Sequence, residues 1–451
     1  MRTRHPLGLY ILFLTELWER FGFYCMSAVF LYYMKNPHNG FPELQGRASR
    51  ILGLYLGFVY FTPFFGGIAA DRWLGYRKAV LIGGILMGAG YLLLAASTLP
   101  VFCAGLALVI VGNGLFKPNI STMVGKLYPP GDQRVDAAYT IFYMGINVGA
   151  FLAPLTAAVI TVQFHNGIME GYRETFIAAA VGMVVSVVTL LAGNRWIAAA
   201  DRTGSSAAGS TEPEVPWAVQ WRRYEALLII FGVVILFWMA FKQNAGTFNL
   251  WAMNHTHRTP APWLRDIMQV LRLDKLYLEP DGRLSKPLFS AINPFFVIAF
   301  SPLLVWFWGR LRHAGHEPPT PAKVGLGMLL TATAFSIMAV GGLSGGDTGQ
   351  VSGVFLVGAY AVLTLGELCL SPMGLSLVSK LAAAKWRSMW MGGWFVATAL
   401  GGYLSGEIGG FWDDMPHSRF FGLLAGSSLL AFGLLMLFYR RVAAAMPAQK
   451  K

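Results

Sequence analysis

Three ionisable residues interrupt the first apolar stretch of the chain, which runs from about residue 7 to residue 34. Glu16, Glu19 and Arg20 are spaced i, i+3 and i+4, so a helix would place them on one face, and Tyr24 continues that face one turn later. A charged side chain in the middle of a membrane helix costs about 2.5–3.5 kcal/mol on insertion scales. Such a helix is stable only if the charges meet one another or a water-filled cavity. The face therefore forms either an ion-pair network between helices or a site that binds protons and a charged substrate.

The overall composition is that of a polytopic membrane protein. Of the 451 residues, 55% are hydrophobic and 13% are charged, and the mean hydropathy is +0.53; soluble domains carry about 25% charged residues. The three cysteines, Cys25, Cys103 and Cys369, all lie in apolar stretches, and we expect reduced, buried packing residues and neither a disulfide nor a metal site. The net charge of +13 is divided among loops between apolar segments, so we expect no nucleic-acid partner.

Twelve apolar segments are each near 20 residues or longer, which is enough to span a membrane. We expect an all-α polytopic membrane protein with helices over about 7–34, 48–70, 79–97, 100–123, 137–164, 171–193, 223–252, 287–309, 323–343, 351–379, 388–411 and 419–439. Charged residues interrupt the first segment and no cleavage site follows it, so it is expected to be a retained span and not a signal peptide. An even number of spans puts both termini on one side. Most Lys and Arg residues fall on that side, so the positive-inside rule makes it the cytoplasm.

A polar stretch rich in Gly and Ser divides the spans six and six. We expect an N-terminal six-helix bundle over 1–193, a cytoplasmic linker over 194–222 and a C-terminal six-helix bundle over 223–451. Two similar halves with a central site are typical of transporters, whereas a channel or a membrane enzyme does not require them. The polar loop at 254–286 is expected to carry a short surface helix near 262–273.

A lysine in the fourth span adds a fourth charge at membrane depth. Lys117 needs a partner there, and Glu16 or Glu19 is the natural one. Together with Arg20, these residues sum to zero net charge, and a single proton unbalances the set.

Polar groups also lie within three other predicted spans. Glu367 and Ser371 are spaced i, i+4 and share a helix face. A lone acid at that depth either binds an ammonium group or stays protonated and bonds to a backbone carbonyl. Asn147 and Asn293 could hydrogen-bond either a peptide group or a neighbouring helix.

Basic groups in the first half and an acid in the second half suit a zwitterion such as a short peptide. Arg20 and Lys117 would hold its carboxylate, and Glu367 would hold its amine. Four aromatic residues from different spans could wall the pocket, although each alone is typical of packing or an interface anchor: Tyr24, Tyr60, Trp238 and Trp394.

The loop at 66–78 is rich in Gly, Arg and Lys and resembles the loop signature of the major facilitator superfamily. Asp71, followed by Arg72, could cap a neighbouring helix or pair with an arginine and so latch a cytoplasmic gate. An ordinary positively charged inner loop is the alternative.

Taken together, these motifs resemble the proton-dependent oligopeptide transporters, the POT or PTR family. The similarity runs from the first span to the eleventh over the segments 16–21, 71–75, 112–119, 142–149, 237–238, 293–294, 367–376 and 394–395. The resemblance implies a major facilitator fold of two six-helix bundles with alternating access. The linker is too short and polar for the two extra helices that many bacterial members carry.

The resemblance also implies a role for each matching residue. The proton-coupling cluster would consist of Glu16, Glu19, Arg20 and Lys117. The peptide carboxylate would contact Arg20, Tyr24 and Lys117, and the amine would contact Asn147, Asn293 and Glu367. The pocket walls would be Tyr60, Trp238, Ser371 and Trp394, and the gating residues would be Asp71, Arg72 and Lys242.

Three positions depart from the family pattern. Phe23 stands where a second tyrosine is usual, Ser27 where an arginine is usual, and Lys242 where an acid is usual. The last two would pair across the outer gate in the family, and here that pair cannot form. We expect proton coupling without the seventh-span acid, and Glu407 is a candidate partner for Lys242.

We therefore expect a proton-coupled symporter that imports di- and tripeptides across the inner (cell) membrane, with both termini cytoplasmic. It is expected to act as a monomer, with protons as the coupling ion and with no cofactor, metal or catalytic residue. One alternative is a family relative that carries another small solute, such as nitrate or a modified amino acid; retained Glu367 favours an amine-bearing substrate. Another is a peptide receptor that does not transport. A membrane enzyme is disfavoured because no nucleophile–base pair is apparent.

Overall fold

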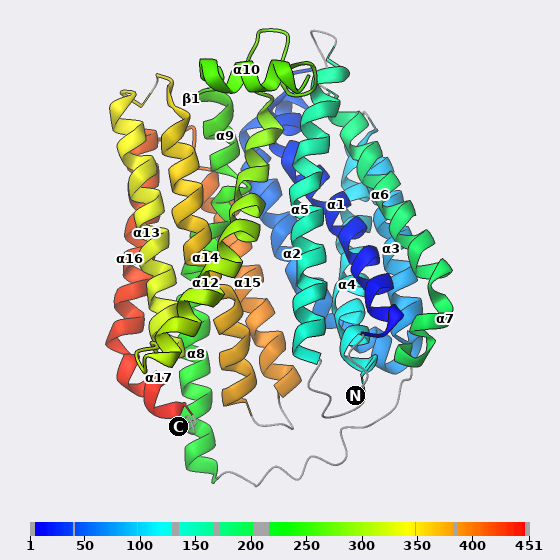
Figure 1. Ribbon diagram of the computed structural model, residues 1–451, viewed down its shortest axis with the longest axis vertical. Coiled ribbons are helices and arrows are strands. Elements are labelled where there is room, and N and C mark those ends of the chain that lie inside the picture. Colours follow the sequence, from blue (N-terminus) through cyan, green and yellow to red (C-terminus); the bar gives the residue numbers. More distant parts are fainter. Residues whose placement is uncertain are drawn as a thin grey trace. The chain divides into compact units, whose positions relative to one another are not determined.

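The computed structural model describes residues 5–38, 41–96, 98–128, 135–165, 171–201, 216–347, 349–382 and 387–446. Long helices make up most of this part of the chain (Figure 1). The first half contains α1 (Leu7–Lys35), η1 (Pro42–Arg47), α2 (Ala48–Ala69), η2 (Ala70–Leu74), α3 (Tyr76–Leu94), α4 (Leu99–Lys126), α5 (Val135–Gln163), α6 (Tyr172–Ala192), α7 (Asn194–Ile197) and η3 (Ala198–Asp201).

The second half begins with α8 (Trp217–Phe241), and the order of its elements follows the predicted spans. The next elements are η4 (Lys242–Asn244), α9 (Thr247–Asn254), β1 (Thr256–His257), α10 (Pro262–Val270), α11 (Asp274–Tyr277), η5 (Lys286–Ala291) and α12 (Ile292–His313). They are followed by α13 (Thr320–Ser344), β2 (Val351–Ser352), α14 (Gly353–Leu381), α15 (Arg387–Gly409), α16 (His417–Leu437) and α17 (Tyr439–Ala445).

Within the described residues, 10 helical segments are long and apolar enough to cross a membrane. The helices α1 and α15, of 29 and 23 residues, lie outside that set; the three charges of α1 lower its average hydropathy. With these two helices the count reaches the expected twelve. The predicted fold class, an all-α polytopic membrane protein, is confirmed, and so is the surface helix, which is α10.

Two details differ from the predictions. The seventh predicted span matches the candidate membrane span Val219–Asn254, but it contains a break, because α8 ends at Phe241 and the 3₁₀ turn η4 precedes α9. The Gln243 side chain stabilises this break by donating to the backbone oxygen of Ser405 (2.7 Å). Cys103 is exposed and not buried, because it lies on a face of α4 that does not pack against the rest of the protein. Cys25 and Cys369 are buried as expected.

Contacts divide the chain into two compact units. The first comprises Met1–Gly204, Asn249–Met253 and Arg258–Pro294, and the second comprises Ser205–Phe248, Asn254–His257 and Phe295–Lys451. The predicted bundle boundaries stay predictions, and the Gly- and Ser-rich part of the linker, 204–213, lies outside the described residues. The division shows that part of the chain after the linker packs with the first half.

In the first unit, α1 packs on α5 and α6, and α4 packs on α2 and α3. The α2–α4 crossing depends on glycine: a Cβ built on Gly66 would lie only 2.0 Å from the backbone oxygen of Gly114. Small residues let membrane helices approach this closely. The close crossing brings α2, with Tyr60, against α4, with Lys117.

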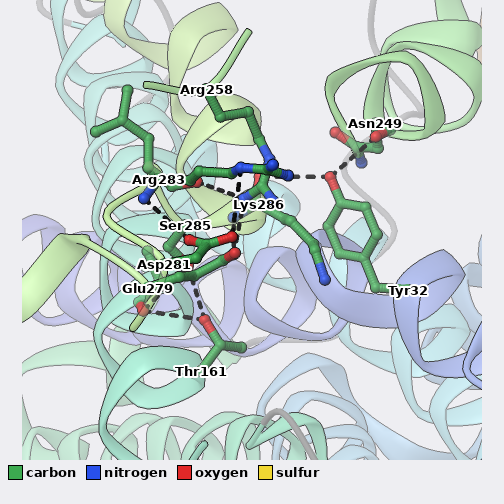
Figure 2. A network of polar contacts seen from close by, with 11 residues as sticks. Tyr32, Thr161, Asn249, Arg258, Glu279, Asp281, Arg283, Ser285 and Lys286 are labelled. Atoms are coloured by element: carbon green, nitrogen blue, oxygen red, sulfur yellow. Dashed lines mark hydrogen bonds and ion pairs between the residues drawn. The ribbon is translucent and has the colours of Figure 1, made fainter. Parts of the chain in front are cut away.

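The segment 258–291, here called the strap, follows α9 and packs on α5 within the first unit. Figure 2 shows its polar contacts. The Thr161 and Ser285 hydroxyls are 2.9 Å apart and both residues are buried. Tyr32 of α1 donates from its hydroxyl to the backbone oxygen of Asn249 (3.1 Å). These bonds join the strap to α5 and the first turn of α9 to α1.

The strap is also held together internally. Arg258, which is 5% exposed, donates from Nη1 to Glu279 Oε1 (2.8 Å) and to the backbone oxygen of Leu284 (2.6 Å). Buried charged hydrogen bonds of this kind are stronger than neutral ones. The strap is therefore an ordered element and not a loose loop.

In the second unit, α13 packs on α14 and α16, and α8 packs on α15 and α16. The two-residue strands β1 and β2 pair in parallel, with Thr256 opposite Val351. This short ladder joins the chain after α9 to the start of α14.

Candidate functional site

The three charges of α1 form one buried cluster. Arg20 donates to both carboxylate oxygens of Glu19, from Nη2 to Oε1 at 2.6 Å and from Nε to Oε2. Its Nε also lies 3.4 Å from Glu16 Oε1. The exposed fractions of Glu16, Glu19 and Arg20 are 1%, 0% and 3%. Charges buried this deeply are stable only when paired, since one unpaired charge costs about 3–5 kcal/mol.

A fourth polar residue completes the cluster from α4. Asn113, 0% exposed, accepts from Arg20 Nη2 at its Oδ1 (3.1 Å). Its Nδ2 donates to the backbone oxygen of Val59 (2.9 Å). That oxygen has no helical partner, because the residue four positions later in α2 is Pro63, which has no N–H. Asn113 therefore provides a hydrogen-bond partner both for the Arg20 guanidinium and for the Val59 carbonyl group, which Pro63 leaves without its helical donor.

Asn113 was not among the predicted site residues. The signal was present, since an amide between two glycines lies four residues before Lys117, on the same helix face. The sequence analysis weighed only the charged residue on that face.

Lys117 lies beside this cluster. Its Nζ is 4.3 Å from the centre of the Tyr60 ring, a cation–π contact. The charges of Arg20, Glu19 and Lys117 all act on the Glu16 carboxylate. The four predicted coupling residues thus lie in one region of the first unit, and their role in coupling stays a prediction.

Tyr24, Asn147 and Asn293 also belong to the first unit. Tyr24 is half-buried, with its ring edge-on to Phe23 at 5.3 Å. Asn147 donates to the backbone oxygen of Tyr143 in its own helix (2.9 Å). Asn147 and Asn293 were expected to bind the substrate amine together with Glu367, which belongs to the second unit, and that grouping stays a prediction.

The remaining predicted pocket residues lie in the second unit. Glu367 and Ser371 are half-buried on α14. Trp394 of α15, which is 3% exposed, packs directly on Gly374, where an added Cβ would lie 1.8 Å from the indole. Gly374 is three residues after Ser371, so Trp394 covers the same face of α14.

Trp238 packs from α8 onto α15. A Cβ built on Gly401 would lie 2.5 Å from the Trp238 Cβ, and the indole is 8% exposed. The side chain of Lys242, one turn later, places its Nζ 5.2 Å from the centre of the Trp238 ring. The bond between Gln243 and Ser405 brings this turn next to α15, which also carries Glu407. The pairing of Lys242 with Glu407 stays a prediction.

Asp71 and Arg72 are exposed on the π-helical turn η2. The Tyr76 hydroxyl donates to Asp71 Oδ1 (2.6 Å), and Lys126 Nζ lies 4.2 Å from the centre of the Tyr76 ring. Tyr76 was not predicted as a partner of Asp71. These contacts join the ends of α2, α3 and α4, and the role of Asp71 in gating stays a prediction.

Comparisons with known proteins agree with this fold. A family model described as the POT family matches residues 77–222 and 280–438, more than half of the chain. The chain is 32% identical to the peptide transporter YePEPT of Yersinia enterocolitica, over 90% of this chain and 88% of the relative. It is 32% identical to the uncharacterized transporter YclF of Bacillus subtilis, over 96% of this chain and 93% of the relative.

Solved structures give the same result. A crystal structure of a peptide transporter POT in complex with sulfate matches with a TM-score of 0.85 and 29% identity, over 99% of this chain and 97% of that one. A mutant of a peptide transporter POT in complex with alafosfalin matches with a TM-score of 0.84 and 30% identity over the same shares. The family model, the relatives and the architecture agree: this chain belongs to the POT family.

Proposed function

We propose that this chain is a proton-coupled symporter that imports di- and tripeptides by alternating access. The observation that carries the proposal is the buried, charge-balanced cluster of Glu16, Glu19 and Arg20, with Lys117 beside it. Relatives named as peptide transporters and as dipeptide and tripeptide permeases support the substrate class.

The cluster supplies a direct route from proton binding to substrate binding. Arg20 hydrogen-bonds to Glu19 and Asn113 and forms an ion pair with Glu16, so three side chains hold its guanidinium. A proton on Glu16 or Glu19 neutralises one carboxylate and weakens its attraction for Arg20 and Lys117. Either base can then bind a peptide carboxylate, while Glu367 binds the amine. The bundles then move between inward-open and outward-open states.

The energy released by one proton is sufficient to drive peptide accumulation. One proton crossing 100 mV releases about 2.3 kcal/mol. Since about 1.4 kcal/mol corresponds to a factor of ten, one proton can drive several-tenfold peptide accumulation. The transporter would act in the inner membrane as a monomer with both termini cytoplasmic, and protons would be its only coupling ion.

Uptake of labelled dialanine into liposomes tests the substrate. We expect unlabelled dialanine to compete and nitrate at the same concentration to leave uptake unchanged. No uptake of labelled dialanine, together with uptake of labelled nitrate, would contradict peptide transport and favour a relative that carries another solute. Binding of dialanine without counterflow would favour the receptor. The Glu367→Gln variant should lose dialanine uptake, since the amine would lose its charged partner.

A further inference from the structure

Two tyrosines beside the coupling cluster have hydroxyls with no hydrogen-bond partner among the described residues. They are Tyr55 of α2, which is 2% exposed, and Tyr91 of α3, which is 0% exposed. The Oε2 atom of Glu16 is also buried and has no hydrogen-bond partner among the described residues. Buried polar groups are nearly always hydrogen-bonded. Three such atoms lie around this one cluster, and a second arrangement of its side chains could satisfy them.

Both tyrosine rings pack against the turn of α1 that follows Glu19 and Arg20. The Tyr55 ring stacks on Phe23 with centroids 6.3 Å apart, and the Arg20 guanidinium lies 5.0 Å from the centre of the same Phe23 ring. A Cβ built on Gly22 would lie 3.1 Å from Tyr91 Cε2. The two rings are therefore fixed by packing, and only the hydroxyl hydrogens can reorient.

The cluster's charges reach these hydroxyls. Arg20 and Glu19 act electrostatically on both Tyr55 and Tyr91, and the two tyrosines act on each other. The ionisable groups that face this region are Glu16, Glu19, Arg20 and Cys25 from α1, Tyr60 from α2 and Lys117 from α4. In the proposed cycle, the two basic groups, Arg20 and Lys117, separate from the acids Glu16 and Glu19.

We propose that Tyr55 and Tyr91 are positioning residues of the coupling cluster, whose hydroxyls donate to the carboxylate oxygens that Arg20 releases. When Arg20 leaves Glu19, two bonds to that carboxylate are lost in a site with almost no solvent. Once freed from Arg20, the carboxylate can turn about its own side-chain bonds toward a tyrosine hydroxyl, which can then donate to it without movement of the tyrosine ring. The hydroxyls thus stabilise the ionised acid late in the cycle and help it release its proton. This inference rests on the proposed function.

The test compares Tyr55→Phe and Tyr91→Phe with the wild-type chain in liposomes. Each variant keeps the ring and its packing and removes only the hydroxyl. Gradient-driven dialanine uptake is measured across external pH, and counterflow is measured at equal pH on both sides. We expect the midpoint of the pH profile to move by about 0.5–1 unit toward alkaline pH, since each donor removed makes proton release less favourable. Counterflow should stay within about twofold of wild type.

Tyr33→Phe is the matched control. Tyr33 lies on α1, the helix that carries Glu16, Glu19 and Arg20, and is 1% exposed, but its ring packs on Phe102 and Phe176, and the charge that acts on it is Arg173. This variant should keep the wild-type midpoint. A purely structural role for Tyr55 and Tyr91 would lower the melting temperature and leave the midpoint unchanged, and that result would overturn the inference. An equal shift in Tyr33→Phe would also overturn it. If the wild-type chain shows no response to the gradient, both the inference and the proposed function fail.

Discussion

At the scale of single residues, Arg20 is the group on which the site depends. Its guanidinium hydrogen-bonds to Glu19 and Asn113 and pairs with Glu16, and all four residues are at most 3% exposed. The i, i+3, i+4 spacing predicted that the charges of α1 share a face, because helix geometry fixes that relation. The spacing could not predict Asn113, since its role depends on a carbonyl group that Pro63 leaves open on another helix.

Replacing Asn113 should destabilise the first unit. In Asn113→Leu, one N–H of Arg20 and the carbonyl of Val59 lose their partner in a buried site, at about 1–3 kcal/mol for each group. We expect a loss of roughly 2–4 kcal/mol in the free energy of unfolding, measured by thermal melting in detergent. Thr156→Ala, which removes only an exposed hydroxyl bonded within α5, is the control and should change stability little. Equal melting temperatures for Asn113→Leu and wild type would show that Asn113 does not support the cluster.

Lys242 is predicted to take part in proton coupling at the outer end of the seventh span. It stands where the family usually has an acid, so coupling must proceed without that carboxylate. If Lys242 pairs with Glu407, then Lys242→Ala and Glu407→Gln should each reduce proton-driven uptake by a similar factor. Unchanged coupling in both variants would remove Lys242 from the mechanism.

At the scale of helices and loops, the strap is the feature that sequence patterns could not place. Its polarity and its short helix were predicted from composition, but its packing on α5 depends on side-chain contacts between distant segments, such as Thr161 with Ser285. The break in the seventh span was also missed. Residues 242–246 form a short polar interruption of the apolar run, and its conformation depends on the tertiary bond from Gln243 to the backbone oxygen of Ser405.

Removing the buried hydroxyl pair should loosen the strap. In the double variant Thr161→Val and Ser285→Ala, the bonds between the two hydroxyls and from Ser285 to the Ala158 backbone oxygen are lost. We expect faster amide hydrogen exchange across 258–291 and unchanged exchange in α13 and α14 of the second unit. Asp281→Ala is the control, because its pair with Arg283 is about half exposed and contributes little. Equal exchange in the double variant and the control would contradict the docking of the strap.

The fold around His255, which directly follows α9, should lose stability at acid pH. The His255 ring lies 4.3 Å from the His417 ring, and burial lowers the pKa of His255 below its usual value of 6.5, although Asp347 opposes this effect. Well above pH 6.5 this residue is neutral in both folded and unfolded chains. As pH falls below that value, the unfolded chain binds a proton more readily, so stability decreases. His255→Gln should therefore flatten the decrease in melting temperature between about pH 7 and pH 5; an unchanged slope would contradict this account.

At the scale of the whole molecule, the sequence was sufficient for the fold class because spans of 20 or more apolar residues allow few alternatives. Family membership followed from motifs distributed over nearly the whole chain and is shown by the family model. The predicted residues fall into two sets, with the coupling cluster in the first unit and Glu367, Ser371 and the two tryptophans in the second.

Concentrative uptake by a cluster variant tests this account most directly. Wild-type protein in liposomes should accumulate labelled dialanine when the outside is acidic and only equilibrate it without a gradient. Glu19→Gln removes one acid that Arg20 holds, so it should abolish the response to the gradient while counterflow continues. Accumulation by Glu19→Gln equal to that of wild type, or no response of the wild-type protein to the gradient, would contradict the claim that a proton on this cluster drives peptide transport.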